Sequence, residues 1–88
     1  MEIHKIYYTP TFERNWRKLP AEVKKKAEKK EKLFRQNAFH PSLVTHNLKG
    51  KLKDYWSFSL DYHTRIVFRF FKKGEVLFVD VGTHEVYK

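Results

Sequence analysis

The chain has 88 residues, of which 41% are hydrophobic, so we expect one domain, residues 1–88, with a thin core. Cysteine is absent, which excludes disulfides and cysteine-ligated metals, and no apolar run approaches the roughly 18 residues of a membrane span. Nineteen Lys and Arg against ten Asp and Glu leave a net charge of +9. This excess favours nucleic acid or an acidic protein as partner, although a basic surface can also serve solubility alone.

The N-terminal half predicts a strand followed by two helices. Residues 2–8 have strand composition and end at Thr9-Pro10. Phe12, Trp16 and Leu19 then recur at helical spacing, behind a cap at Thr9 or Thr11. Pro20 suits the first position of a second helix that runs to about residue 36. The polar face of that helix is rich in lysine and is either a docking surface for nucleic acid or a solvated face; it includes Lys24, Lys25 and Lys29.

The C-terminal half predicts three strands. Residues 37–47 lack either periodicity and contain Pro41, so we expect a loop. Residues 55–60 and 64–71 alternate, and Lys73-Gly74 predicts a tight turn into a last strand over 76–81. The order strand-helix-helix-strand-strand-strand predicts an α+β fold, with two helices on one face of a mostly antiparallel four-stranded sheet.

Strand alternation also predicts which residues lie on the sheet face that the helices leave open. If Ile66, Phe68 and Phe70 face the helices, the arginines between them face away. A two-residue turn at Lys73-Gly74 sets Arg69 opposite Phe78 and Val67 opposite Asp80, with Leu77, Val79 and Val81 inward. The connection 61–63 then places Ser59 opposite Arg65 and Ser57 opposite Val67. The open face is thus expected to hold Phe78 and the polar residues Ser57, Ser59, Arg65, Arg69 and Asp80.

Three short motifs resemble the RelE/ParE superfamily of toxin–antitoxin toxins. They are His46-Asn47-Leu48-Lys49-Gly50, Tyr62-His63-Thr64-Arg65-Ile66-Val67-Phe68, and Val81-Gly82-Thr83-His84 with Tyr87 close behind. The resemblance covers nearly the whole chain and implies a RelE-like fold and a ribosome-dependent mRNA endonuclease of the RelE or YafQ-like branch. It also implies a cognate antitoxin that holds the toxin inactive, with a free toxin that is monomeric and a complex that is hetero-oligomeric.

The resemblance assigns four residues to catalysis. Arg65 matches the strand arginine on the scissile phosphate, and His84 matches the Gly-x-(Arg/His) position. Tyr87 resembles a C-terminal aromatic that stacks on a base or assists proton transfer, although the spacing from His84 is one residue tighter than usual. His46 resembles a loop histidine of the YafQ-like branch. The lysines that RelE itself uses are replaced by Ser57 and Ser59, so proton transfer would fall to histidine.

These residue types suit RNA cleavage without a metal. A base takes the 2′-OH proton, a cation stabilises the phosphorane and an acid protonates the leaving oxygen. Histidine and guanidinium supply these parts. We expect the RNA backbone to be contacted by four basic residues, Lys49, Lys51, Lys53 and Arg69.

Other interpretations stay open for each part of the site. Arg65 could form a salt bridge with Asp80, and Tyr87 could anchor the C-terminal tail on the sheet. His46 and His84 could each be surface histidines that bind nothing. His4, His40 and His63 are too scattered to bind metal, so we expect no metal or cofactor. We expect a cytoplasmic protein without a membrane partner. A ParE-like inhibitor of DNA gyrase and a non-catalytic basic nucleic-acid-binding module are the alternative functions.

Overall fold

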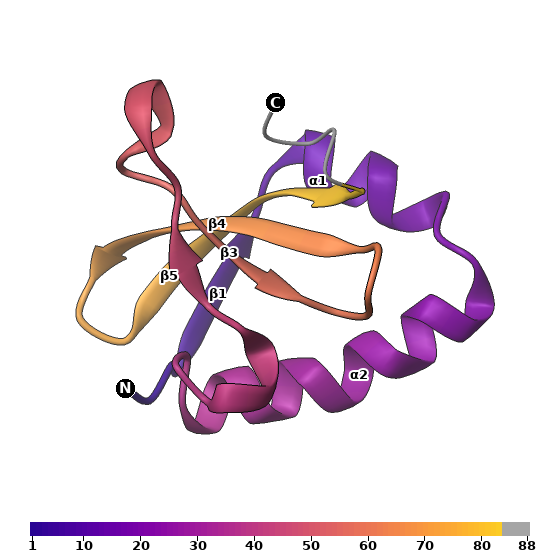
Figure 1. The fold of residues 1–88 in the computed structure, drawn as a ribbon, viewed down its shortest axis with the longest axis horizontal. Helices are drawn as coiled ribbons and strands as arrows, with labels where there is room; N and C mark the ends of the chain where they lie inside the picture. The colour runs from indigo at the N-terminus through magenta and orange to yellow at the C-terminus, as the bar shows by residue number, and fades with distance from the viewer. Residues whose placement is uncertain (84–88) are drawn as a thin grey trace.

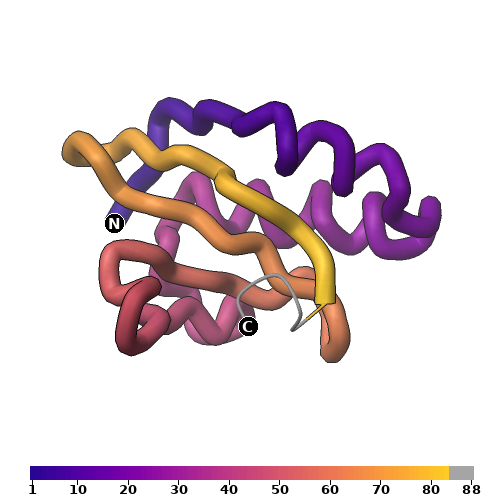
Figure 2. Tube along the Cα trace, turned by 90° about the horizontal axis from the view of Figure 1, so that it is seen from above, coloured from indigo at the N-terminus to yellow at the C-terminus, as the bar shows by residue number. Residues whose placement is uncertain are grey.

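The computed structural model describes residues 1–83, which form one sheet with two helices packed against it (Figure 1). The five strands lie in the order β1-β5-β4-β3-β2, and β1 runs parallel to β5 while the other pairs are antiparallel. Figure 2 shows β5, in yellow, between α1 and β4. The elements are β1 (Lys5–Tyr8), α1 (Pro10–Arg17), α2 (Ala21–Gln36), β2 (His46–Asn47), β3 (Trp56–Ser59), β4 (Arg65–Lys72) and β5 (Glu75–Gly82), with 3-10 turns η1 (Pro41–Leu43) and η2 (Gly50–Leu52).

The α+β architecture follows the prediction, but the strand count does not. The sheet has five strands because His46–Asn47, inside the predicted loop 37–47, pairs antiparallel with Ser57 and Trp56. A two-residue strand carries no readable alternation, and it exists only through its partner strand. The remaining loop residues include η1, which the sequence pattern did not indicate either.

Both helices begin close to where the sequence predicted. Thr9 caps α1, since its Oγ1 accepts a hydrogen bond from the Phe12 amide at 2.9 Å. The second helix begins at Ala21, and Pro20 occupies the capping position rather than the first turn. Within residues 1–83, neither helix combines the length and apolarity needed to cross a membrane.

Phenylalanines form the centre of the core between α2 and the sheet. Phe34 of α2 is fully buried; its ring stacks on Phe58 at 4.6 Å and meets Phe68 and Phe78 edge-on at 5.0 and 5.6 Å. Phe12 of α1 packs on Phe78 at 5.4 Å. The predicted inward orientation of Phe58 and Phe68 is therefore confirmed. Rigid rings in contact at these distances hold both helices on one sheet face.

The β4–β5 hairpin contains two irregularities that compensate each other. The turn falls at Lys73-Gly74, as predicted, but Phe71 has no partner across the ladder, so the register shifts by one residue. Val79 on β5 is then unpaired as well, which restores the predicted pairing of Val67 with Asp80. Each extra residue is a β-bulge, which reverses the side-chain parity beyond it.

Between the two bulges, the predicted orientation of β5 is wrong. Phe78 was expected on the open face, yet it is buried in the core, and Arg69 pairs with Leu77 instead. Leu77 and Val79, expected inward, are only half-buried, whereas Val81 is buried as predicted. A tight-turn signal sets the register at the hairpin end only, so an inserted bulge overturns it.

Candidate nucleic-acid interface

The open sheet face carries cross-strand rows of polar side chains near one end of β4. Ser59 pairs with Arg65, and one row along, His46 pairs with Ser57, which pairs with Val67. The pairs Ser59–Arg65 and Ser57–Val67 match the predicted register, whereas the pairing of His46 with Ser57 was not predicted. Because directly paired residues point to the same side of a sheet, Arg65 and His46 share the face opposite the helices.

Arg65 lies folded against the β3–β4 loop. Its Nη1 donates to the carbonyl oxygens of Asp61 at 2.8 Å, Tyr62 at 3.1 Å and Thr64 at 3.3 Å. Arg65 is half-buried, and all three bonds use one of the three guanidinium nitrogens. The side chain is therefore held in place with its positive charge uncancelled by these neutral partners, as an anion site requires.

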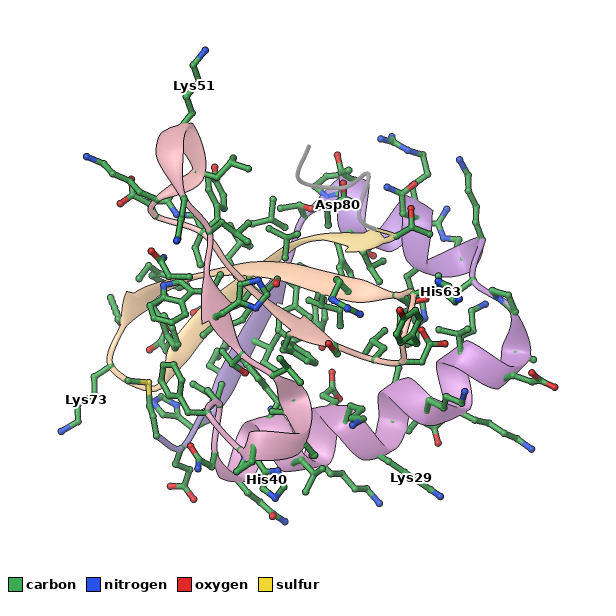
Figure 3. The ribbon with its side chains drawn as sticks, viewed as in Figure 1. Lys29, His40, Lys51, His63, Lys73 and Asp80 are labelled. Carbon is green, nitrogen blue, oxygen red and sulfur yellow. The ribbon has the colours of Figure 1, made fainter. Side chains whose placement is uncertain are left out.

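The expected alternative partner of Arg65, Asp80, bonds elsewhere. Its Oδ1 accepts from Nδ2 of Asn15 in α1 at 2.7 Å and from the Val81 amide at 2.8 Å. Figure 3 shows Asp80 beside α1. These bonds tie α1 to β5. Asp80 pairs with Val67 as predicted, but its carboxylate is engaged by α1 and not by Arg65.

The loop that holds Arg65 is itself closed by hydrogen bonds. Oδ1 of Asp61 accepts from the amides of His63 and Thr64 at 3.0 and 2.8 Å, and the Leu60 amide donates to the Thr64 carbonyl at 2.9 Å. Burial raises the pKa of Asp61, but these amides and nearby Lys26 outweigh it, so the pKa lies below its ordinary value. The loop is therefore a fixed support.

His46 presents a defined ring nitrogen to the same face. Its Nδ1 lies 3.0 Å from the Val44 carbonyl, an acceptor, so Nδ1 carries the proton and Nε2 keeps its lone pair. Nε2 lies 3.5 Å from Oγ of Ser57, which is fully buried. Val44 has a left-handed backbone, with φ 51°, unusual for a β-branched residue. An exposed imidazole whose acceptor nitrogen is held only by a long contact to a serine hydroxyl is suited to take up a proton.

The spacing between Arg65 and His46 follows from sheet geometry. They lie two strands apart and two residues apart along the strand direction. With strands about 4.8 Å apart and a rise of about 3.4 Å per residue, their Cα atoms are roughly 12 Å apart. Two long side chains across that gap can approach one phosphodiester from opposite sides.

His84 and Tyr87 lie outside residues 1–83, so the structure does not place these two predicted site residues. Within the described part, no three His, Asp or Glu side chains gather in a way that could hold a metal ion.

The predicted basic residues fall into two separate surfaces. Lys49, Lys51 and Lys53 are exposed on or beside η2, and Figure 3 shows Lys51 projecting from the tip of that loop. Lys25 and Lys29 are exposed on α2, where Figure 3 shows Lys29 on the opposite side of the molecule. Lys51 and Lys29 therefore lie on opposite sides of the molecule, whereas Lys26, an α2 lysine that was not among the predicted residues, lies 4.0 Å from the Asp61 carboxylate in the loop that holds Arg65.

Lys24, the third predicted lysine of α2, differs from the other two. It is half-buried, and its Nζ donates to the Arg17 carbonyl at 3.3 Å. Part of its role is therefore to cap the end of α1.

The sequence reasoning missed two aromatic residues near these basic groups. The Arg69 guanidinium lies 5.4 Å from the ring centre of Tyr55, a cation–π distance. Strand alternation could have found this pair. Trp56 pairs with Phe68 across the antiparallel strands, so Tyr55, one residue earlier, lies opposite Arg69, one residue later. Tyr62, in the β3–β4 loop, is 83% exposed, and loop residues give no periodic signal.

A cavity of about 400 Å³ lies between α1 and α2, away from the open face. Its apolar lining includes Phe12, Trp16 and Phe78, and its charged lining is net negative, with Glu13, Glu28 and Glu31 against Arg17. An acidic lining repels phosphate, so this cavity is not the nucleic-acid site.

Comparison with solved structures identifies the fold. A YoeB/ParE toxin from Agrobacterium tumefaciens superposes with a TM-score of 0.76 at 19% identity, covering 92% of this chain and 99% of the other. The toxin–antitoxin complexes DinJ–YafQ of E. coli (TM-score 0.70, 17% identity, 99% and 98% covered) and RelBE2 of Mycobacterium tuberculosis (0.70, 20%, 96% and 94%) also match. No protein-family model and no curated protein matches the sequence significantly. The chain thus has the fold of these toxins.

Proposed function

We propose that this protein is the toxin of a toxin–antitoxin pair and a metal-independent endoribonuclease that cleaves mRNA on the ribosome. The observation that carries the proposal is Arg65 and His46 on one open sheet face of a basic protein with this toxin fold. The two matching complexes pair a toxin with an antitoxin, which supports an antitoxin as partner here. The free protein is a cytoplasmic, monomeric single domain, and it forms a hetero-oligomer with the antitoxin.

In the proposed reaction the RNA 2′-oxygen attacks the adjacent phosphorus, and the bond to the 5′-oxygen breaks. The products are a 2′,3′-cyclic phosphate and a free 5′-hydroxyl. His46 takes the 2′-OH proton on Nε2, because Nδ1 is engaged by Val44. Arg65 stabilises the charge on the phosphorane oxygens. His84 is the candidate acid for the leaving oxygen, and Tyr87 positions the neighbouring base.

The basic surfaces bind the ribosome and the mRNA backbone. Lys49, Lys51, Lys53 and Arg69 border the open face and contact mRNA phosphates. Lys25 and Lys29, with Lys24 behind them, dock on rRNA from the opposite side. Since each phosphate contact displaces counterions, ribosome affinity should fall by orders of magnitude between about 50 and 200 mM salt. Lysine-to-glutamate reversal at these three α2 positions should weaken ribosome binding without unfolding the protein.

The test is primer extension on mRNA after induction, with purified ribosomes for single-turnover rates. Arg65→Lys keeps a cation that can bond the loop carbonyls but lacks the guanidinium fork, so its rate should fall about 100- to 1000-fold. His46→Gln should lose about 100-fold or more, as expected for a general base. Arg14→Lys and His4→Gln are matched controls at exposed positions away from the face and should cleave normally.

Circular dichroism and melting temperature verify that each variant is folded. A folded Arg65→Ala protein that still arrests growth would remove Arg65 from the site. Gyrase-linked DNA breaks without RNA cleavage would identify a gyrase inhibitor instead. If neither is found, the protein is a non-catalytic nucleic-acid-binding module.

A further inference from the structure

Tyr62 is the most exposed large hydrophobic side chain in residues 1–83, at 83%. Single exposed aromatics are ordinary on protein surfaces, so exposure alone carries no function. What distinguishes Tyr62 is its setting: it lies at the turn between β3 and β4, next to the guanidinium that we place on the scissile phosphate. Figure 3 shows the neighbouring His63 at this end of the sheet.

The backbone of Tyr62 is held by bonds on both sides. Its carbonyl accepts from Arg65 Nη1 at 3.1 Å, and the carbonyl of the preceding Asp61 accepts from the same nitrogen at 2.8 Å. The Asp61 carboxylate binds the next two amides, of His63 and Thr64. The ring therefore projects from a fixed loop, and little backbone entropy remains to be lost when a ligand binds it.

The Tyr62 ring also has a neighbour that orients it. The His63 ring meets it nearly at a right angle, 86°, with 4.9 Å between ring centres. This edge-to-face contact leaves ring surface open, as the high exposure of Tyr62 shows. Arg65, Tyr62 and His63 thus place a cation, an open aromatic surface and a polar ring side by side.

From this geometry we propose that Tyr62 is a stacking platform for an unpaired RNA base next to the phosphate that Arg65 binds. Proteins bind single-stranded RNA by stacking splayed bases on aromatic rings while cations contact the backbone. Stacking reads ring area rather than base edges, so the site accepts any base and prefers purines. The proposal rests on the proposed RNA-cleaving function for its substrate, but its test measures binding alone.

The probe is a short single-stranded oligonucleotide with 2′-O-methyl riboses, which cannot be cleaved because the attacking hydroxyl is blocked. Its affinity is measured by fluorescence anisotropy at about 50 mM salt, where phosphate contacts are strongest. Tyr62→Ala should weaken binding about 5- to 150-fold, the effect of removing one stacked base. Tyr62→Phe keeps the ring and should bind within about twofold of wild type.

Two further variants separate stacking from general damage. Phe39→Ala removes another exposed aromatic, one that packs on Trp56 and Phe70, and should leave binding unchanged. Asp61→Ala keeps the Tyr62 ring but frees its loop, so binding should weaken although the aromatic remains.

Wild-type affinity in Tyr62→Ala, equal losses in Tyr62→Phe and Tyr62→Ala, or no binding by the wild-type protein would each overturn the platform. The proposed endonuclease fails separately, if wild-type protein leaves mRNA uncut on ribosomes. A tyrosine-dependent affinity in a protein that cuts nothing would keep the platform and discard the enzyme.

Discussion

Val44 provides a sharp test of the loop that positions His46. Its φ of 51° is in the left-handed region, which costs an L-residue about 1–2 kcal/mol and glycine nothing. Against this, glycine loses more backbone entropy on folding than alanine does, which lowers stability by about 0.5–1 kcal/mol. Val44→Gly and Val44→Ala lose the same side-chain contacts beyond Cβ. We therefore expect the glycine variant to have the larger free energy of unfolding, by about 0.5–1 kcal/mol.

The measurement is urea unfolding followed by tryptophan fluorescence, with Trp16 and Trp56 both half-buried reporters. Glu28, exposed in α2, is the matched control, because glycine there should be less stable than alanine by about 1 kcal/mol. The sign of the Gly–Ala difference must therefore reverse between the two sites. An alanine variant at Val44 as stable as the glycine variant would refute the left-handed conformation and, with it, the carbonyl geometry that we assign to His46.

Phe34→Ala should lower the free energy of unfolding by about 3–5 kcal/mol in the same urea assay, because three ring contacts are lost; a loss under about 1 kcal/mol would contradict its central place. Gly74→Ala should cost about 1–2 kcal/mol, since φ is +76° and the new Cβ would lie 2.5 Å from the His4 ring. Gly74→Ala should lower the free energy of unfolding by less in a His4→Ala background than in the wild type. An equal loss in both backgrounds would show that the His4 ring moves aside without cost. Asp61→Ala should cost about 1–3 kcal/mol at pH 7. Because folding lowers the Asp61 pKa, the wild-type advantage is present above 3.8, its ordinary value, and is lost as pH falls through the lower folded value. An advantage that persists undiminished at pH 2 would exclude that carboxylate as its source.

The sequence by itself determined the elements whose pattern is local. The helical spacing of Phe12 and Trp16, the Thr9 cap and the Lys73-Gly74 turn each depend on neighbours within a few residues. The register of Ser59 with Arg65 was also predictable, because a three-residue connection and strict alternation leave one choice that keeps Phe58 in the core.

Only the tertiary structure decided the features that depend on distant partners. The strand His46–Asn47 exists because β3 lies beside it, and the two bulges turn Phe78 inward because Phe12 and Phe34 provide a core for its ring. The bonds of Arg65 to three loop carbonyls likewise need a closed loop, which Asp61 supplies. Burial of an aromatic ring outweighs the loss of one ladder pair, so packing, which sequence spacing does not encode, sets the final register.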